Sequence, residues 1–122
     1  MMNRILIGAA LLGFVSVFMG ALGDHGFDLT PEKAKSLETA IRYNMVYAVL
    51  IVAIAVAPED RKLHIPAYLF TAGTVVFSFS IYGSLLSGIK ELTYLTPVGG
   101  ITIMIGWLAL AWRGAFLIRG NQ

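Results

Sequence analysis

The chain contains no cysteine, and only 13% of its 122 residues are Asp, Glu, Lys or Arg. The missing cysteine excludes disulfides, thiolate chemistry and cysteine-ligated metal sites. The charged fraction is about half that of a soluble domain, and 57% of the residues are hydrophobic, which argues against a disordered chain or an ordinary water-soluble domain. Because the net charge is only +2 and no dense basic run occurs, we expect no nucleic-acid partner.

Ionisable residues are also missing where membrane transporters carry them. The middles of the long apolar stretches hold no Asp, Glu, Lys, Arg or His, although such residues mark ion and substrate paths. Proton-coupled export through a membrane carboxylate, voltage sensing and a buried proton relay are therefore disfavoured. No phosphate-binding glycine loop followed by Lys and no G-x-S-x-G nucleophile elbow is present. We expect no cofactor, and the sequence shows no enzyme chemistry.

Four apolar stretches dominate the chain, at residues 5–22, 40–57, 66–86 and 98–118. Each approaches or exceeds the ~18–20 residues that a helix needs to cross ~30 Å of hydrocarbon. Within lipid they must be helical, because every backbone polar group needs an internal partner. The sequence predicts an all-α fold, a single membrane domain over residues 1–122 in which four transmembrane helices form a bundle. We expect the first stretch to be retained, because its apolar run is longer than that of a signal peptide.

The second helix is predicted to begin before the membrane. Thr30 is a typical N-cap, Pro31 suits the first helical position, and Glu32 lies near the positive end of the helix dipole. Apolar residues then recur on one face, at Ala34, Leu37, Ile41 and Met45. This pattern predicts an amphipathic segment at the membrane interface that extends the second helix. The fourth helix is predicted to start in a similar way at Thr96-Pro97.

Positive charges on the two sides of the predicted bundle nearly balance. One side carries Arg4, Arg61, Lys62, Arg113 and Arg119, and the other carries Lys33, Lys35, Arg42 and Lys90. Because Arg42 lies inside a helix, it counts less, and the positive-inside rule then favours both termini in the cytoplasm.

Small residues mark the places where helices in lipid can pack closely. In the first helix they recur on one face, at Ala9, Gly13, Ser16, Gly20 and Gly23. In the fourth helix they recur at Gly99, Thr102, Gly106 and Ala109. We predict that these faces pack inside the bundle. The alternative is that they line a cavity or contact another subunit.

Polar residues gather near one interface, where the end of the first helix, the start of the second and the third loop meet. This polar cluster comprises Asp24, His25, Arg42, Asn44, Tyr47 and Thr96. It is either a pocket for a headgroup, an ion or a partner, or a set of helix caps and interfacial anchors. Asp24 could pair with Arg42, and Glu38 also precedes Arg42 by one turn, in the favourable order. No metal site is expected, because the other histidine, His64, lies on the opposite side.

Four segments carry a resemblance that covers nearly the whole chain. Residues 20–26 (GALGDHG) resemble G-A-F-G-A-H-A/G, and residues 39–48 (TAIRYNMVYA) resemble T-A-V-R/Q-Y-Q-M-Y-H-A. Residues 77–82 (FSFSIY) resemble F-S-G-S-L-Y, and residues 96–100 (TPVGG) with Gly106-Trp107 resemble T-P-I-G-G and G-W. The pattern is similar to that of domain of unknown function 423, or uncharacterised protein family 0382, to which transmembrane protein 256 of animals is also similar. The resemblance implies a four-span protein of the bacterial inner (plasma) membrane and brings no activity.

Three positions depart from the family pattern. Tyr47 stands in place of a His, Asn44 in place of a Gln and Phe79 in place of a Gly. Because the family's His is missing, metal binding and acid–base catalysis are disfavoured further. The leading prediction is a small accessory or structural membrane protein that associates with itself, with a membrane-protein partner or with membrane lipid. The alternatives are a small carrier or channel built on the polar cluster, and a membrane enzyme acting on a lipid headgroup.

Overall fold

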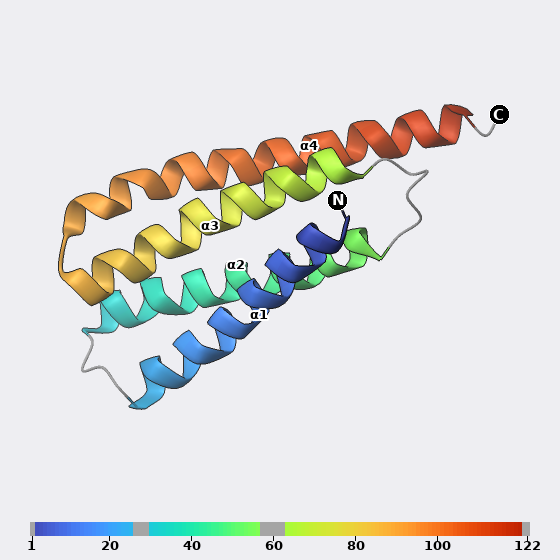
Figure 1. Ribbon diagram of the computed structural model, residues 1–122. Coiled ribbons are helices and arrows are strands. Elements are labelled where there is room, and N and C mark those ends of the chain that lie inside the picture. The colour runs from blue at the N-terminus through green and yellow to red at the C-terminus, as the bar shows by residue number, and fades with distance from the viewer. Residues whose placement is uncertain (1, 26–29, 57–62, 121–122) are drawn as a thin grey trace.

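A computed structural model describes residues 2–25, 30–56 and 63–120 of the chain. Figure 1 shows four long helices, α1 (Met2–His25), α2 (Pro31–Ala55), α3 (His64–Ser87) and α4 (Thr96–Gly120). A short 3₁₀ helix, η2 (Lys90–Leu95), connects α3 to α4. The described residues outside these helices form turns and caps, so the predicted all-α fold is confirmed.

Consecutive helices run in opposite directions along the molecule (Figure 1). The end of α1, the start of α2, the end of α3 and the start of α4 lie together at one end of the molecule, here called the η2 end. Most of the packing joins helices that follow one another in the chain, α1 with α2, α2 with α3, and α3 with α4. Since α2 and α3 have a neighbour on each side, the buried residues concentrate on them.

Each long helix is long and apolar enough to cross a membrane. A helix of 24 or 25 residues extends roughly 36 Å, more than the ~30 Å of hydrocarbon. Large apolar side chains on α1 and α4 point outward, among them Leu11, Phe14, Val17, Met104 and Leu108. A surface of this kind suits lipid, so the predicted four transmembrane helices are confirmed.

The start of α2 follows the prediction closely. The Thr30 hydroxyl caps the helix by accepting a hydrogen bond of 3.3 Å from the backbone N–H of Lys33, and Pro31 is the first helical residue. The first six residues of α2 are exposed, and burial begins at Leu37. The predicted extension of the second helix is therefore present as the first, exposed turns of one continuous helix.

The buried face of α2 differs from the one that the apolar pattern predicts. Of the four predicted residues, Leu37 is buried and Ile41 is half-buried, whereas Ala34 and Met45 are exposed, with the Met45 sulfur still in contact with α1. The inward positions are Leu37, Ala40, Asn44, Tyr47, Ala48, Ile51 and Ile54. In lipid, an apolar residue gains little by facing another helix, so small and polar residues decide which face turns inward.

The connection between α3 and α4 is more ordered than the loop expected from the sequence. Gly88 ends α3 with a φ of 76°, a left-handed conformation that glycine adopts without strain. The chain then forms η2 directly and enters α4 at Thr96, where the fourth helix was predicted to start. The Thr96 side chain contacts the Ser80 hydroxyl across the gap to α3, with 2.6 Å between the two oxygens. This contact anchors the start of α4 on α3.

Glycines bring the backbones of α3 and α4 into close contact. A Cβ placed on Gly99 would lie 2.7 Å from the carbonyl oxygen of Gly73, and closer still to the Phe77 backbone nitrogen. A Cβ on Gly106 would lie 2.9 Å from the ring of Phe70. Two of the predicted small residues of α4 therefore form the seam with α3, as small residues do between helices in lipid.

The remaining predicted small residues take different places. Ala9 and Ser16 of α1 are buried, and a Cβ on Gly13 would lie at 3.9 Å, in ordinary contact with Ala48 of α2. A Cβ added to Gly20 would have no neighbouring atom within 4 Å outside its own helix turn. Thr102 is half-buried and donates a hydrogen bond of 2.8 Å to the Val98 carbonyl of its own helix. A Cβ on Gly23 would lie 2.8 Å from Leu37 Cδ2, so the packing of α1 against α2 reaches from the middle turns of α1 to its last turns.

Candidate functional site

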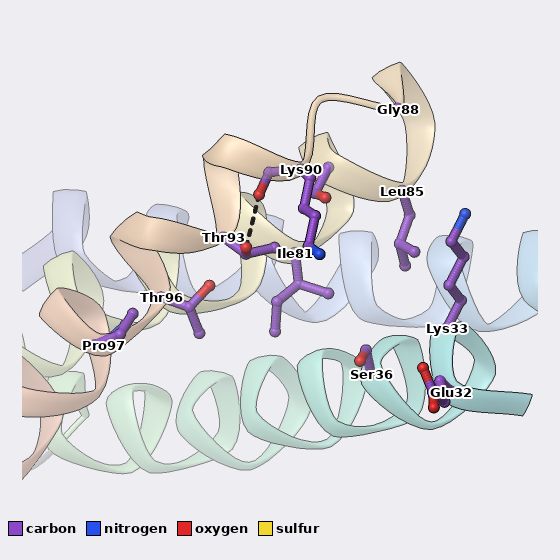
Figure 2. A pocket seen from close by; sticks show the side chains of 11 residues that line it. Glu32, Lys33, Ser36, Ile81, Leu85, Gly88, Lys90, Thr93, Thr96 and Pro97 are labelled. Carbon is purple, nitrogen blue, oxygen red and sulfur yellow. Dashed lines mark hydrogen bonds between the residues drawn. The ribbon is translucent and has the colours of Figure 1, made fainter.

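A pocket of about 760 Å³ opens at the η2 end, where α2 begins and α3 ends. Figure 2 shows its walls, with the first turns of α2 on one side and η2 with the last turns of α3 on the other. The described residues that line it are Glu32, Lys33, Ser36, Ile81, Ser84, Leu85, Gly88, Lys90, Thr93, Thr96 and Pro97. The pocket therefore joins two regions that are far apart in the sequence, the start of α2 and the continuous segment from the end of α3 to the start of α4.

Three charged side chains enter this pocket. Lys33 and Glu32 come from the first turn of α2, and Lys90 reaches toward α2 from η2 on the opposite wall (Figure 2). Among the described residues, the ion pair within 4.0 Å is that of Glu38 with Arg42. The three pocket charges are thus not paired with one another or with another described side chain, so they can bind charges of a ligand.

Hydroxyl groups complete the polar part of the lining. Thr93 donates a hydrogen bond of 2.7 Å to the Lys90 carbonyl, which stabilises the turn of η2 that carries Lys90. Thr96 is held by its contact with Ser80. The side chains of Ser36 and Ser84 make no hydrogen bond to another described residue, so both hydroxyls are free to bind a ligand.

The rest of the pocket lining is apolar. Ile81 and Leu85 of α3 and Pro97 of α4 lie between the polar groups. A second pocket of about 310 Å³ adjoins it and shares Glu32, Ser36 and Ile81 with it. Polar groups around an apolar interior at the end of a membrane helix match the chemistry of an amphiphile, whose polar head and apolar chains need both environments.

A second set of polar side chains lies deeper, between α2 and α3. The Asn44 side-chain amide donates a hydrogen bond of 3.0 Å to the Tyr82 hydroxyl, and the Ser78 hydroxyl donates one of 2.8 Å to the Ala40 carbonyl. Asn44 and Ser78 are both fully buried. These bonds join the two central helices inside the bundle, where no water competes for them.

Two buried polar atoms at this interface have no partner among the described residues, Asn44 Oδ1 and Thr74 Oγ1. Asn44 lies one turn beyond Ala40 on α2, and Thr74 lies one turn before Ser78 on the antiparallel α3. Since Ser78 bonds to Ala40, the two unpartnered groups lie at about the same level. Such atoms carry a desolvation cost that a hydrogen bond would remove.

The four described side chains of the predicted polar cluster, Arg42, Asn44, Tyr47 and Thr96, take different positions. The Arg42 side chain is 61% exposed and lies 3.5 Å from Glu38, the partner in the favourable order. Asn44 and Tyr47 point inward on the same helix, and Thr96 lines the pocket. The backbone of Asp24 and His25 forms the last turn of α1, where the sequence predicted a loop. Their side chains lie outside the described residues, as does the predicted pair of Asp24 with Arg42.

The pocket shares Thr96 with the predicted polar cluster, and its other lining residues lie outside that cluster. Glu32, Thr93 and Thr96 belong to the segments that the sequence brings to this interface. Lys33 and Lys90 are not members of the predicted cluster. Their position on the same side of a four-span chain, each beside a helix end, is the signal that could have identified them.

The fold and the pocket define a four-helix integral membrane protein with a polar pocket at one membrane face. The chain belongs to the family described as "Protein of unknown function (DUF423)", whose family model matches residues 19–100. It is therefore a multi-pass protein of the inner membrane to whose family no activity is assigned.

Relatives match over nearly the whole chain. A UPF0382 membrane protein of Haemophilus influenzae is 32% identical over 120 residues, which cover 95% of this chain and 96% of the relative. The UPF0382 inner membrane protein YgdD of Escherichia coli K12 is 36% identical, with 93% and 90% of the two chains covered. A UPF0382 membrane protein of Schizosaccharomyces pombe is 34% identical over 110 residues, 84% of this chain and 93% of the relative. No solved structure matches the chain.

Proposed function

We propose that this protein is a small accessory membrane protein that binds membrane lipid and holds a phospholipid headgroup in the pocket at the η2 end. The observation that carries the proposal is the approach of Lys33 and Lys90 from opposite walls of one pocket, neither paired with a described acidic side chain. Two ammonium groups beside hydroxyls form a binding site for a phosphodiester.

The position of the pocket along the helices supports a lipid as the ligand. The first turns of α2 are exposed and polar, and η2 is exposed over most of its length. Lysines at the ends of membrane helices place their ammonium groups at the level of the lipid headgroups. The phosphodiester of a lipid in the same leaflet therefore lies at the same depth in the membrane as the pocket.

The surface beside the pocket suits the acyl chains of such a lipid. Pro97 lines the pocket, and the next turn of α4 exposes Val98 and Ile101. Leu95, at the end of η2, is also exposed. The chains of a lipid whose headgroup occupies the pocket can lie along this apolar strip of α4.

Native mass spectrometry of the gently extracted protein tests the proposal. We expect the wild-type protein to retain one phospholipid, and the double variant Lys33→Ala/Lys90→Ala to retain at most about a tenth as much. That factor corresponds to about 1.4 kcal/mol of lost charge-assisted bonding. The matched control is Arg4→Ala/Arg113→Ala, which removes two cations at the opposite end and should leave the bound lipid unchanged.

Three other results would contradict the proposal. Equal lipid retention in both double variants would show that the pocket does not hold the lipid. A second copy or another membrane protein in stoichiometric amount, with no lipid, would favour an accessory role through protein contacts. Solute flux in liposomes that contain this protein alone would favour the carrier or channel alternative.

A further inference from the structure

The pocket at the η2 end contains a negative charge as well as two positive ones, and this mixture points to one class of headgroup. We infer that the pocket selects a phospholipid whose headgroup carries a phosphate and a primary ammonium group, of the phosphatidylethanolamine class. The inference rests on the proposed function and adds the identity of the lipid. Lys33 and Lys90 hold the phosphate, and Glu32 holds the ammonium group.

The α2 wall of the pocket carries a carboxylate and a hydroxyl beside Lys33, whereas the charge on the η2 wall is that of Lys90. Glu32 and Ser36 are one turn apart on α2 and lie next to each other in Figure 2. Together they present a carboxylate and a hydroxyl, which are acceptors for an ammonium group with three N–H donors. Lys90 reaches toward them from η2, and Lys33 rises from α2 at the rim. A ligand with separated positive and negative ends can therefore match both walls at once.

A headgroup that is only anionic fits this arrangement less well. Phosphatidylglycerol would place its phosphate between the lysines but would leave the Glu32 carboxylate unpaired beside an anion. The repulsion between two like charges is strong at the low effective dielectric of a membrane interface. Glu32 therefore disfavours a purely anionic headgroup and favours one that carries an ammonium group.

A choline headgroup also fits less well. Its quaternary ammonium has no N–H to donate to Glu32 or Ser36, and proteins that bind choline surround it with aromatic rings. Among the described residues that line the two pockets, none is aromatic. The lining thus favours a primary ammonium group, which hydrogen bonds can hold.

A competition experiment tests the headgroup class. The protein in detergent is mixed with equimolar phosphatidylethanolamine, phosphatidylcholine and phosphatidylglycerol of identical chains, and the bound lipids are counted by native mass spectrometry. We expect at least about fivefold more phosphatidylethanolamine than either competitor. Glu32→Gln should abolish this preference and keep the binding of phosphatidylglycerol. The control Glu38→Gln changes an acid of the same helix that pairs with Arg42 and should leave the preference unchanged.

The outcomes separate this inference from the proposed function. If Lys33→Ala/Lys90→Ala loses lipid while Glu32→Gln keeps the preference, the pocket binds lipid and the assignment of Glu32 is wrong. If neither variant changes lipid binding, both the inference and the proposed function fail. Soluble phosphoethanolamine at the same concentration should not displace the lipid, and displacement would show that the ligand is a free headgroup.

Discussion

The indole nitrogen of Trp107 donates a hydrogen bond of 2.7 Å to the hydroxyl of Tyr47. Trp107 belongs to α4 and Tyr47 to α2, so the bond joins two helices that mainly pack through α3. Both aromatic rings also contact Phe70 of α3, with centroids at 5.1 Å from Trp107 and 5.4 Å from Tyr47. The three rings therefore link α2, α3 and α4.

Removal of the Tyr47 hydroxyl should weaken this link. Tyr47→Phe keeps the ring but leaves the Trp107 N–H without its acceptor, and we expect a loss of about 0.6–1.7 kcal/mol in the free energy of unfolding. Tyr43→Phe is the matched control, because the Tyr43 ring stacks on Phe77 and its hydroxyl makes no hydrogen bond to a described residue. Reversible unfolding in mixed micelles measures both variants, and equal losses would contradict the role of the hydrogen bond.

Two adjacent glycines of α4 should respond differently to the same substitution. Gly99→Ala places a Cβ against the backbone of α3 and forces the helices apart, at a cost of about 2 kcal/mol. Gly100→Ala places its Cβ 3.9 Å from the Phe77 ring, in ordinary contact, and should cost nothing because alanine favours the helix. Thermal unfolding in detergent compares the two, and a Gly99→Ala protein as stable as Gly100→Ala would refute the close approach of α3 and α4.

Two fully buried hydroxyls of α3, those of Ser78 and Thr74, differ in whether they have a hydrogen-bond partner. Ser78 bonds to the Ala40 carbonyl, whereas Thr74 Oγ1 has no partner among the described residues. We expect Ser78→Ala to cost about 0.6 kcal/mol. Thr74→Val should be neutral or stabilising, because it removes a desolvated group and keeps the shape. Unfolding titrations of the two variants provide the measurement. A loss of stability in Thr74→Val would show that the hydroxyl is bound in the native protein.

The parts of the fold that depend on local properties of the chain could be predicted. The length of each apolar stretch determines that four helices cross the membrane, because unpaired backbone groups are too costly in lipid. The start of α2 at Thr30-Pro31 was predictable for a similar reason, since the cap and the first turn involve only neighbouring residues. The contact of Glu38 with Arg42 is likewise local, one turn apart on one helix.

The rotation of α2 could not be predicted from the apolar pattern. In a soluble protein, burial of apolar residues sets the inward face, but lipid accommodates them on the outside equally well. Met45 is 37% exposed and contacts α1 through its sulfur, which accepts a hydrogen bond from the Ser16 hydroxyl, whereas Asn44 beside it is fully buried. The hydrogen bond from Asn44 to Tyr82 on α3 contributes to this orientation, and no spacing within α2 reveals it.

The sequence by itself determined that this chain is a four-helix membrane protein, where its second and fourth helices start, and which charges belong to each side. Only the tertiary structure decided that Lys33 and Lys90 share a pocket with Glu32. The lysines belong to segments separated by two membrane crossings, and η2 turns Lys90 back toward α2. The physical reason is that helix formation depends on near neighbours, whereas a site depends on how antiparallel helices pack and on the direction in which the connection leaves α3.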